Sequence, residues 1–270
     1  MRDAYGNAAL GIARREKGLQ TSGMNDLPTK RTAFVVLGMH RSGTSSVAGV
    51  LALLGATPPR TLMGPKPENP KGFWESEVLM TFNDEILTRA GSAWDDPGPL
   101  DHGVFDGAQG DDLRRRAREK LDEEFGDADT IVIKDPRICR FYPFWRDVLV
   151  SAGYEPFVIL PLRDPAEVAT SLQARNGMPI ESGLKLWRRH VEDAERTTRG
   201  QRRRIIVWSQ FLESWRDEIT SINSECGDIL RGADKGVDDF LALPKKIRER
   251  DLDIDPLTRA TFEHISGLMK

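Results

Sequence analysis

Residues 33–45 decide the fold, and they read Ala33-Phe34-Val35-Val36-Leu37-Gly38-Met39-His40-Arg41-Ser42-Gly43-Thr44-Ser45. The first five form a nearly continuous apolar run, as in a central strand that is covered on both faces. Beyond the loop, helical spacing links Val47, Val50, Leu51 and Leu54. Between strand and helix lie Gly38 and Gly43. Glycines at such a turn let backbone N–H groups converge on a phosphate at the positive end of the helix. We therefore predict a phosphate site here.

This loop has the frame of a nucleotide-binding P-loop, with one departure. Loops that bind ATP or GTP carry a Lys immediately before the hydroxyl residue, and Thr44 occupies that position here. The strong cation is instead Arg41, two residues before the second glycine. A glycine turn that merely starts a helix is the alternative interpretation. The strand before the loop and the helix after it favour a phosphate site.

Further apolar, β-branched runs predict three more strands, at Thr130–Ile133, Pro156–Leu162 and Arg204–Trp208. Stretches with helical spacing of apolar residues lie between and after them, at 79–86, 113–125, 145–149, 184–191 and 211–222. This alternation predicts an α/β P-loop nucleotide-binding fold with a central parallel sheet and helices on both faces. Ligands of such folds bind at the carboxyl ends of the strands.

Length and composition limit the possible functions. The 270 residues indicate one domain, which we place at 31–270 after a flexible N-terminal tail at 1–30. A net charge of -3 gives no general attraction to nucleic acid. Cys139 and Cys226 lack metal-ligand spacing, which fits a reducing compartment. Because no apolar run reaches the ~20 residues that span a bilayer and no signal pattern is visible, we expect a cytoplasmic protein without integral membrane contact.

A second candidate anion site follows the strand predicted at Pro156–Leu162. The segment Arg163-Asp164-Pro165-Ala166-Glu167 begins the next helix, with an Asp N-cap, a Pro in the first turn and a Glu that would complete a capping box. A well-capped helix would explain those three residues. It does not explain why Arg163 closes a buried strand, with Ser171 two turns down the helix. An arginine fork suits a terminal phosphate.

Together the two motifs resemble the sulfotransferase superfamily. Arg41-Ser42-Gly43-Thr44-Ser45 is similar to the family's 5′-phosphosulfate loop, and Arg163 and Ser171 have the spacing of its 3′-phosphate residues. The resemblance implies 3′-phosphoadenosine 5′-phosphosulfate (PAPS) as donor and its desulfated product PAP, bound by these residues. Since a sulfuryl group carries less charge than a phosphoryl group, cations and backbone donors can replace magnesium. We expect no metal.

The resemblance also suggests residues for the chemical step. In their motifs these residues are closer to the tyrosylprotein and heparan sulfate branches than to the cytosolic phenol sulfotransferases. Those branches use a Glu base after the first helix, which Glu75 matches best and Glu77 second. In the tyrosylprotein branch a Lys-Asp-Pro sequence follows a strand, and Lys134-Asp135-Pro136 matches it here. The resemblance implies that Lys134 stabilises the transferring group together with Arg41. A surface ion pair of Asp135 with Lys134 or Arg137 is the alternative. His102 is the reserve base, and His190 is expected to be structural.

Three points stay open. Trp208 stands where the family has a Tyr near the adenine, so it could bind cofactor or belong to the core. The glycine-rich C-terminal signature of cytosolic members is not evident, and Arg231-Gly232 and Lys235-Gly236 are weak substitutes. The acceptor could be a small molecule, a glycan or a peptide tyrosine bound by loops 57–73 and 92–112, and it could receive the sulfuryl group on a hydroxyl or on an amine. An ATP-dependent P-loop kinase and a non-catalytic nucleotide-binding module are the alternative functions, and the sequence does not give the oligomeric state.

Overall fold

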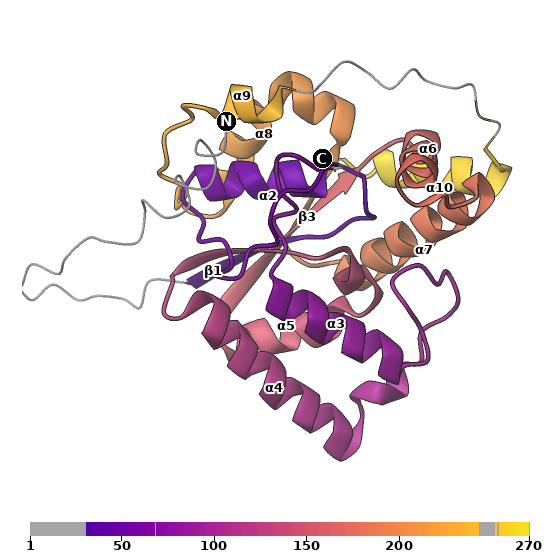
Figure 1. The fold of residues 1–270 in the computed structure, drawn as a ribbon. Helices are drawn as coiled ribbons and strands as arrows, with labels where there is room; N and C mark the ends of the chain where they lie inside the picture. Colours follow the sequence, from indigo (N-terminus) through magenta and orange to yellow (C-terminus); the bar gives the residue numbers. More distant parts are fainter. Residues whose placement is uncertain (1–30, 68, 243–251, 253, 270) are drawn as a thin grey trace, which may run out of the picture.

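The computed structural model describes residues 31–67, 69–242, 252 and 254–269, so the tail predicted at 1–30 lies outside the described residues. Its sheet has four parallel strands in the order β2-β1-β3-β4 (Figure 1). The strands are β1 (Arg31–Val36), β2 (Thr130–Lys134), β3 (Tyr154–Leu162) and β4 (Arg203–Val207). Each lies within two residues of its predicted bounds, and the predicted α/β fold class is confirmed.

The strand register brings four strand ends to one edge of the sheet. Val36 pairs with both Lys134 of β2 and Ile159 of β3, and Leu162 pairs with Val207 of β4. The segments that follow β1 and β3 therefore leave the sheet side by side. The two sequence motifs that carry Arg41 and Arg163 occupy those segments.

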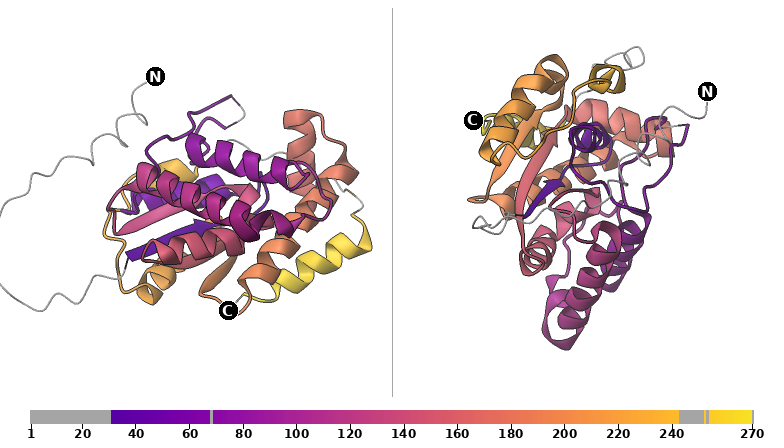
Figure 2. Two further views of the ribbon diagram at one scale, coloured as in Figure 1. Left: turned by 90° about the horizontal axis from the view of Figure 1, so that it is seen from below. Right: turned by 90° about the vertical axis from the view of Figure 1, so that its left-hand side faces the viewer.

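Helices cover both faces of the sheet, as predicted (Figures 1 and 2). On one face, Phe34 and Val36 share a core with α2 (Thr44–Leu53), α8 (Trp208–Glu225) and α9 (Val237–Leu241). On the other face, Ala33 and Val35 pack with α3 (Glu77–Arg89), α4 (Gly107–Phe125), α5 (Tyr142–Ser151) and α7 (Ile180–Thr198). The alternation within β1 follows from the period of two of a strand.

The remaining elements complete the second layer and shape the ligand edge. Helix α6 (Pro165–Asn176) packs on α7, as does α10 (Pro256–Ser266). Two short 3₁₀ helices, η1 (His102–Phe105) and η2 (Pro136–Arg140), follow α3 and β2. Among the described residues, no helix combines the length and the apolar character needed to cross a membrane.

Candidate active site

The loop between β1 and α2 presents the start of a helix without a side-chain cap. Arg41 and Gly43 adopt positive φ values of 70° and 87°, and α2 begins at Thr44 with no side-chain hydrogen bond at its N-cap. A Cβ atom at Gly43 would lie 2.3 Å from Cε3 of Trp208, so only glycine fits against this indole. The open N–H groups of the first turn and the positive helix end suit an anion.

Ser42 adds a buried hydroxyl to the same loop. Its side chain is almost fully enclosed, at 1% exposure, and Oγ has no hydrogen-bond partner among the described residues. A buried polar atom without a partner costs free energy unless a ligand or water satisfies it. This hydroxyl is therefore what a loop built to receive phosphate or sulfate oxygens would supply.

The second motif contacts this loop directly. Nη1 of Arg163 donates to the backbone carbonyl of Arg41 (3.0 Å), and Nε of Arg41 donates to Oγ of Ser171 on α6 (2.8 Å). Ser171 is buried, whereas both arginines are partly exposed. Arg41, Arg163 and Ser171 thus lie together, and a ligand with two anionic groups could contact both motifs at once.

The predicted capping box of α6 forms only in part. Oδ1 of Asp164 accepts from the backbone N–H groups of Ala166 (2.8 Å) and Glu167 (3.3 Å), as an N-cap should. The Glu167 carboxylate, however, accepts from Nε of Arg163 (2.5 Å). Glu167 therefore orients Arg163 at the mouth of the site, a role beyond the expected cap.

The segment before α3 is anchored on α2, and this anchoring turns Glu75 inward. Trp74 has a φ of 57°, its Nε1 donates to the Lys71 carbonyl (3.0 Å), and its ring packs edge-on against Phe240. Gly49 of α2 makes room for both rings, since a Cβ there would lie 2.3 Å from Phe240. The next residue, Glu75, is only 3% exposed.

Glu75 forms a buried ion pair with Lys134 at the end of β2. The Lys134 ammonium, 4% exposed as a residue, donates to Oε1 of Glu75, to the Phe73 carbonyl (3.2 Å) and to Oγ of Ser45 in the phosphate loop (3.4 Å). Ser45 Oγ in turn donates to the Phe73 carbonyl (3.0 Å). The predicted catalytic pair therefore touches the predicted anion loop.

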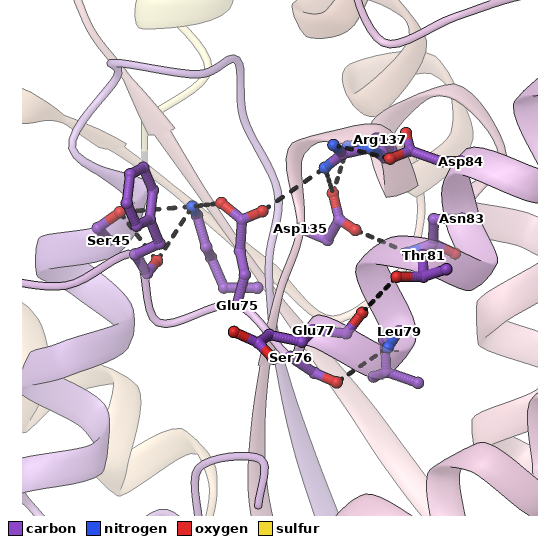
Figure 3. A network of polar contacts seen from close by, with 12 residues as sticks. Ser45, Glu75, Ser76, Glu77, Leu79, Thr81, Asn83, Asp84, Asp135 and Arg137 are labelled. Atoms are coloured by element: carbon purple, nitrogen blue, oxygen red, sulfur yellow. Dashed lines mark hydrogen bonds and ion pairs between the residues drawn. The ribbon is translucent and has the colours of Figure 1, made fainter. Parts of the chain in front are cut away.

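Arg137 holds the other oxygen of Glu75. Its Nη1 lies 3.5 Å from Oε2 of Glu75 and 3.0 Å from Oδ1 of Asp135, and its Nε binds Asp84 (Figure 3). Asn83 fixes Asp135 through a hydrogen bond of 2.9 Å. These groups are largely buried, so the alternative of a surface ion pair at Lys134, Asp135 and Arg137 is wrong.

Burial and charge act on Glu75 in opposite directions. Burial raises the pKa of Glu75, while the positive charges of Lys134 and Arg137 oppose that rise. The net result is a raised pKa, so Glu75 is a more basic carboxylate than a solvated one. That is a property that a general base requires.

A cavity of about 410 Å³ opens beside Glu75. It is lined by His40, Met63, Lys66, Phe73, Glu75, Met80, Trp94, Arg137, Arg175 and Asn176. Met63, Lys66 and Phe73 come from loop 57–73 and Trp94 from loop 92–112, the loops expected to shape an acceptor pocket.

His40 is the site residue that sequence reasoning missed. It lies in the phosphate loop at 9% exposure, its ring packs edge-on against Trp94 at 5.1 Å, and Nε2 has no partner among the described residues. Burial, then the charges of Arg137 and Lys134, lower the pKa of His40 well below its ordinary value, so the imidazole is neutral at pH 7. Its position beside Arg41 was the available signal.

Comparison with solved structures identifies the fold. The sulfotransferase domain of the olefin synthase of Synechococcus PCC 7002 matches 92% of this chain and 98% of its own at 13% identity, with a TM-score of 0.52. The chain has the sulfotransferase fold. The sulfotransferase domain from the curacin biosynthetic pathway matches 87% of this chain and 98% of its own at 11% identity, with a TM-score of 0.50. No family model and no curated protein sequence matches the chain.

Within this sulfotransferase fold, three other candidates lie apart from the cavity lining. Glu77 is exposed at the start of α3, and His102 is exposed on η1. His190 is buried in α7, with Nδ1 3.0 Å from the Leu186 carbonyl, in keeping with a structural role. The candidate bases were Glu75, Glu77 and His102, and of these Glu75 alone lines the cavity.

Two further sequence features occupy defined places. Trp208 is 5% exposed, packs on Gly43 and stacks on Phe211, so it supports the anion loop; contact with an adenine remains a prediction. The N–H of Gly232 donates to the Leu54 carbonyl (2.7 Å) at the carboxyl end of α2, opposite the phosphate loop. Arg231-Gly232 therefore does not replace the glycine-rich signature of cytosolic members.

Proposed function

We propose that this chain is a sulfotransferase that moves a sulfuryl group from PAPS to a hydroxyl of an acceptor. The observation that carries the proposal is the direct contact of Arg41 with both Arg163 and Ser171. Neither motif alone distinguishes PAPS from another nucleotide. One site that includes both matches a nucleotide with anionic groups at its 5′ and 3′ ends.

Different groups of the chain would bind the 5′ and 3′ ends of the donor. The backbone N–H groups at 43–45, the hydroxyls of Ser42, Thr44 and Ser45, and Arg41 would hold the 5′-phosphosulfate. Arg163 and Ser171 would hold the 3′-phosphate. The buried hydroxyl of Ser42, which has no hydrogen-bond partner among the described residues, and the uncapped helix start fit such an anion. When bound, PAPS supplies an activated sulfuryl group, and PAP is the product.

Glu75 is assigned the role of base. It would accept the proton of the acceptor hydroxyl as the acceptor oxygen bonds to sulfur and the bond between sulfur and the bridging oxygen breaks. Lys134 and Arg41 would offset the negative charge that develops on that bridging oxygen. Lys134 touches both Glu75 and Ser45, so it lies between the base and the anion loop. No metal ion has a role in this scheme.

Transfer of label tests the proposal. Purified protein is incubated with sulfur-labelled PAPS and separate pools of phenols, sugars, hydroxy acids and tyrosine peptides, and label in the acceptor is measured together with released PAP. Transfer that Glu75→Gln abolishes and that a metal chelator leaves intact supports the assignment. Transfer of phosphate from labelled ATP in the presence of magnesium would instead establish a kinase.

A further inference from the structure

The two carboxylate oxygens of Glu75 face different cations at different distances. Oε1 accepts directly from the Lys134 ammonium, which also contacts Ser45 of the phosphate loop. Oε2 lies 3.5 Å from Nη1 of Arg137, which is longer than an ordinary hydrogen bond. Oε2 is therefore the less tightly bound oxygen, and it is the better placed of the two to accept a proton from an acceptor.

Arg137 keeps this distance although it is a buried cation beside a carboxylate. Its side chain is 8% exposed, and it lines the same cavity as Glu75. A buried guanidinium needs anionic partners, and Glu75 is one that lies within reach. If Arg137 closed on Oε2, it would stabilise the charged form of Glu75 and occupy the oxygen that must take the proton.

Asp84 of α3 is the group that competes with Glu75 for Arg137. Nε of Arg137 donates to Oδ1 of Asp84 (2.5 Å), and Nη2 donates to Oδ2 (3.3 Å). Nη1 donates to Oδ1 of Asp135 (3.0 Å). Each nitrogen of the guanidinium is thus engaged by an aspartate. A paired contact such as that with Asp84 fixes the plane and the position of an arginine side chain.

Asp84 itself lies outside the cavity lining. Its side chain is 45% exposed, and it shares a helix with Asn83, which is buried and donates to Oδ2 of Asp135 (2.9 Å). Two adjacent residues of α3 therefore hold Asp135 and Arg137 (Figure 3). Helix α3 sets where the guanidinium lies relative to the carboxylate of Glu75.

We propose that Asp84 is a positioning residue of the reaction: by binding Arg137 through both oxygens, it keeps the guanidinium from closing on Glu75 and leaves Oε2 available for the acceptor's proton. The inference rests on the proposed function, in which Glu75 is the base. Asp84 acts through Arg137 and touches neither donor nor acceptor. The competing assignment is an ion pair that only contributes to stability, and it predicts no change in the properties of Glu75.

The pKa of Glu75 provides a readout that needs no acceptor. Protein labelled with carbon-13 at the glutamate carboxyl groups is titrated by NMR, and the Glu75 signal is assigned from its absence in Glu75→Gln. The titration is repeated with Asp84→Asn, with Arg137→Met and with the double variant. The double variant separates an effect that passes through Arg137 from a direct effect of the Asp84 charge.

Asp84→Asn should lower the pKa of Glu75, because Arg137 then loses a competing anion and closes on the carboxylate. Arg137→Met should raise this pKa, because it removes a cation whose charge lowers it. The double variant should match Arg137→Met, since without the guanidinium Asp84 has nothing to position.

Glu85→Gln is the matched control. It removes a partly exposed carboxylate at the next position of α3, where the ion-pair partners are Arg116 and Arg89. The control should leave the pKa of Glu75 unchanged. Label transfer from PAPS to the acceptor pools should fall about 10-fold in Asp84→Asn and stay unchanged in Glu85→Gln, while PAP affinity stays within about threefold in both.

The inference is overturned by an unchanged Glu75 pKa in Asp84→Asn, by an equal fall in Glu85→Gln, or by an equal fall when Asp84→Asn is added to Arg137→Met. Asp84 and Glu85 are both partly exposed, so their comparison decides the question even if Arg137→Met does not fold. Absence of label transfer by the unmodified protein would instead overturn the proposed function, and the titrations would still report whether Asp84 positions Arg137.

Discussion

Nε of Arg41 donates a 2.8 Å hydrogen bond to Oγ of Ser171, across 130 residues of sequence. The contact exists because β1 and β3 are adjacent parallel strands, so the loop after one and the helix after the other share an edge of the sheet. Arg163 strengthens the junction through the Arg41 carbonyl. Three of the proposed donor-binding side chains are therefore connected before any ligand arrives.

Replacing Arg163 with Ala should weaken PAP binding by about 10- to 100-fold, because a charge-assisted hydrogen bond contributes about 1.5–3 kcal/mol. Adenosine 5′-phosphosulfate, which lacks the 3′-phosphate, should lose far less. Calorimetry with both ligands measures the ratio, and Arg146→Ala, which removes an exposed cation of α5 that pairs with Asp147, is the control. An equal loss for both ligands would show that Arg163 does not recognise the 3′-phosphate.

Glu75→Gln should lower kcat by about 100-fold or more with little change in PAP affinity, since it removes the base and keeps the shape. Glu77→Gln is the matched control, because Glu77 is exposed two residues further along. Steady-state transfer from PAPS and PAP titrations measure the two effects. Unimpaired turnover in the Glu75 variant would remove this residue from the mechanism.

The pH profile should report the raised pKa of Glu75. As pH falls through that pKa the carboxylate gains a proton and can no longer act as base, so kcat/KM should fall on the acid side. Because burial raises this pKa, the midpoint should lie above the ~4.3 of a solvated glutamate. Rates measured across the acid range in Glu77→Gln should show the same midpoint. A profile that stays flat to about pH 4 is incompatible with this assignment.

Lys134→Met should destabilise the fold most at high pH. Removal of the buried cation takes away a charge that lowers the pKa of Glu75, so the folded-state pKa rises further above the unfolded value. Stability is then lost as pH rises through that interval, because the unfolded state releases its proton first. We expect a loss of about 3–5 kcal/mol at neutral pH, measured by urea unfolding.

The double variant Lys134→Met with Glu75→Gln provides the control for this prediction. It lacks both charges, so its stability should depend much less on pH and should exceed that of Lys134→Met above about pH 7. If the two variants had the same pH dependence, the ion pair would not be what stabilises this region.

Much of the fold and part of the site could be predicted from the sequence. Continuous apolar runs located the strands to within two residues, because strands buried on both faces leave few alternatives. The juxtaposition of Arg163 and Ser171 with the phosphate loop followed from parallel strands that share one carboxyl edge. Each of these predictions depended on local spacing and on one general rule of topology.

The acceptor side of the site could not be predicted in the same way. Glu75 faces the interior because Trp74 adopts a left-handed conformation that aromatic residues rarely take, and because Gly49 accepts Phe240 from a distant helix. His40 meets Trp94 through packing of two loops that lie far apart in the sequence. Sequence spacing contains no signal for such contacts, so a surface ion pair at Lys134, Asp135 and Arg137 stayed open as an alternative and His40 was overlooked.

The most direct test of the central claim is calorimetric comparison of PAP with ADP, each with and without magnesium. A site formed by Arg41, Arg163 and Ser171 should bind PAP at least ~10-fold more tightly than ADP, and magnesium should not be required. Equal affinities, or tight ADP binding that depends on magnesium, would contradict the account and favour an ATP-dependent enzyme.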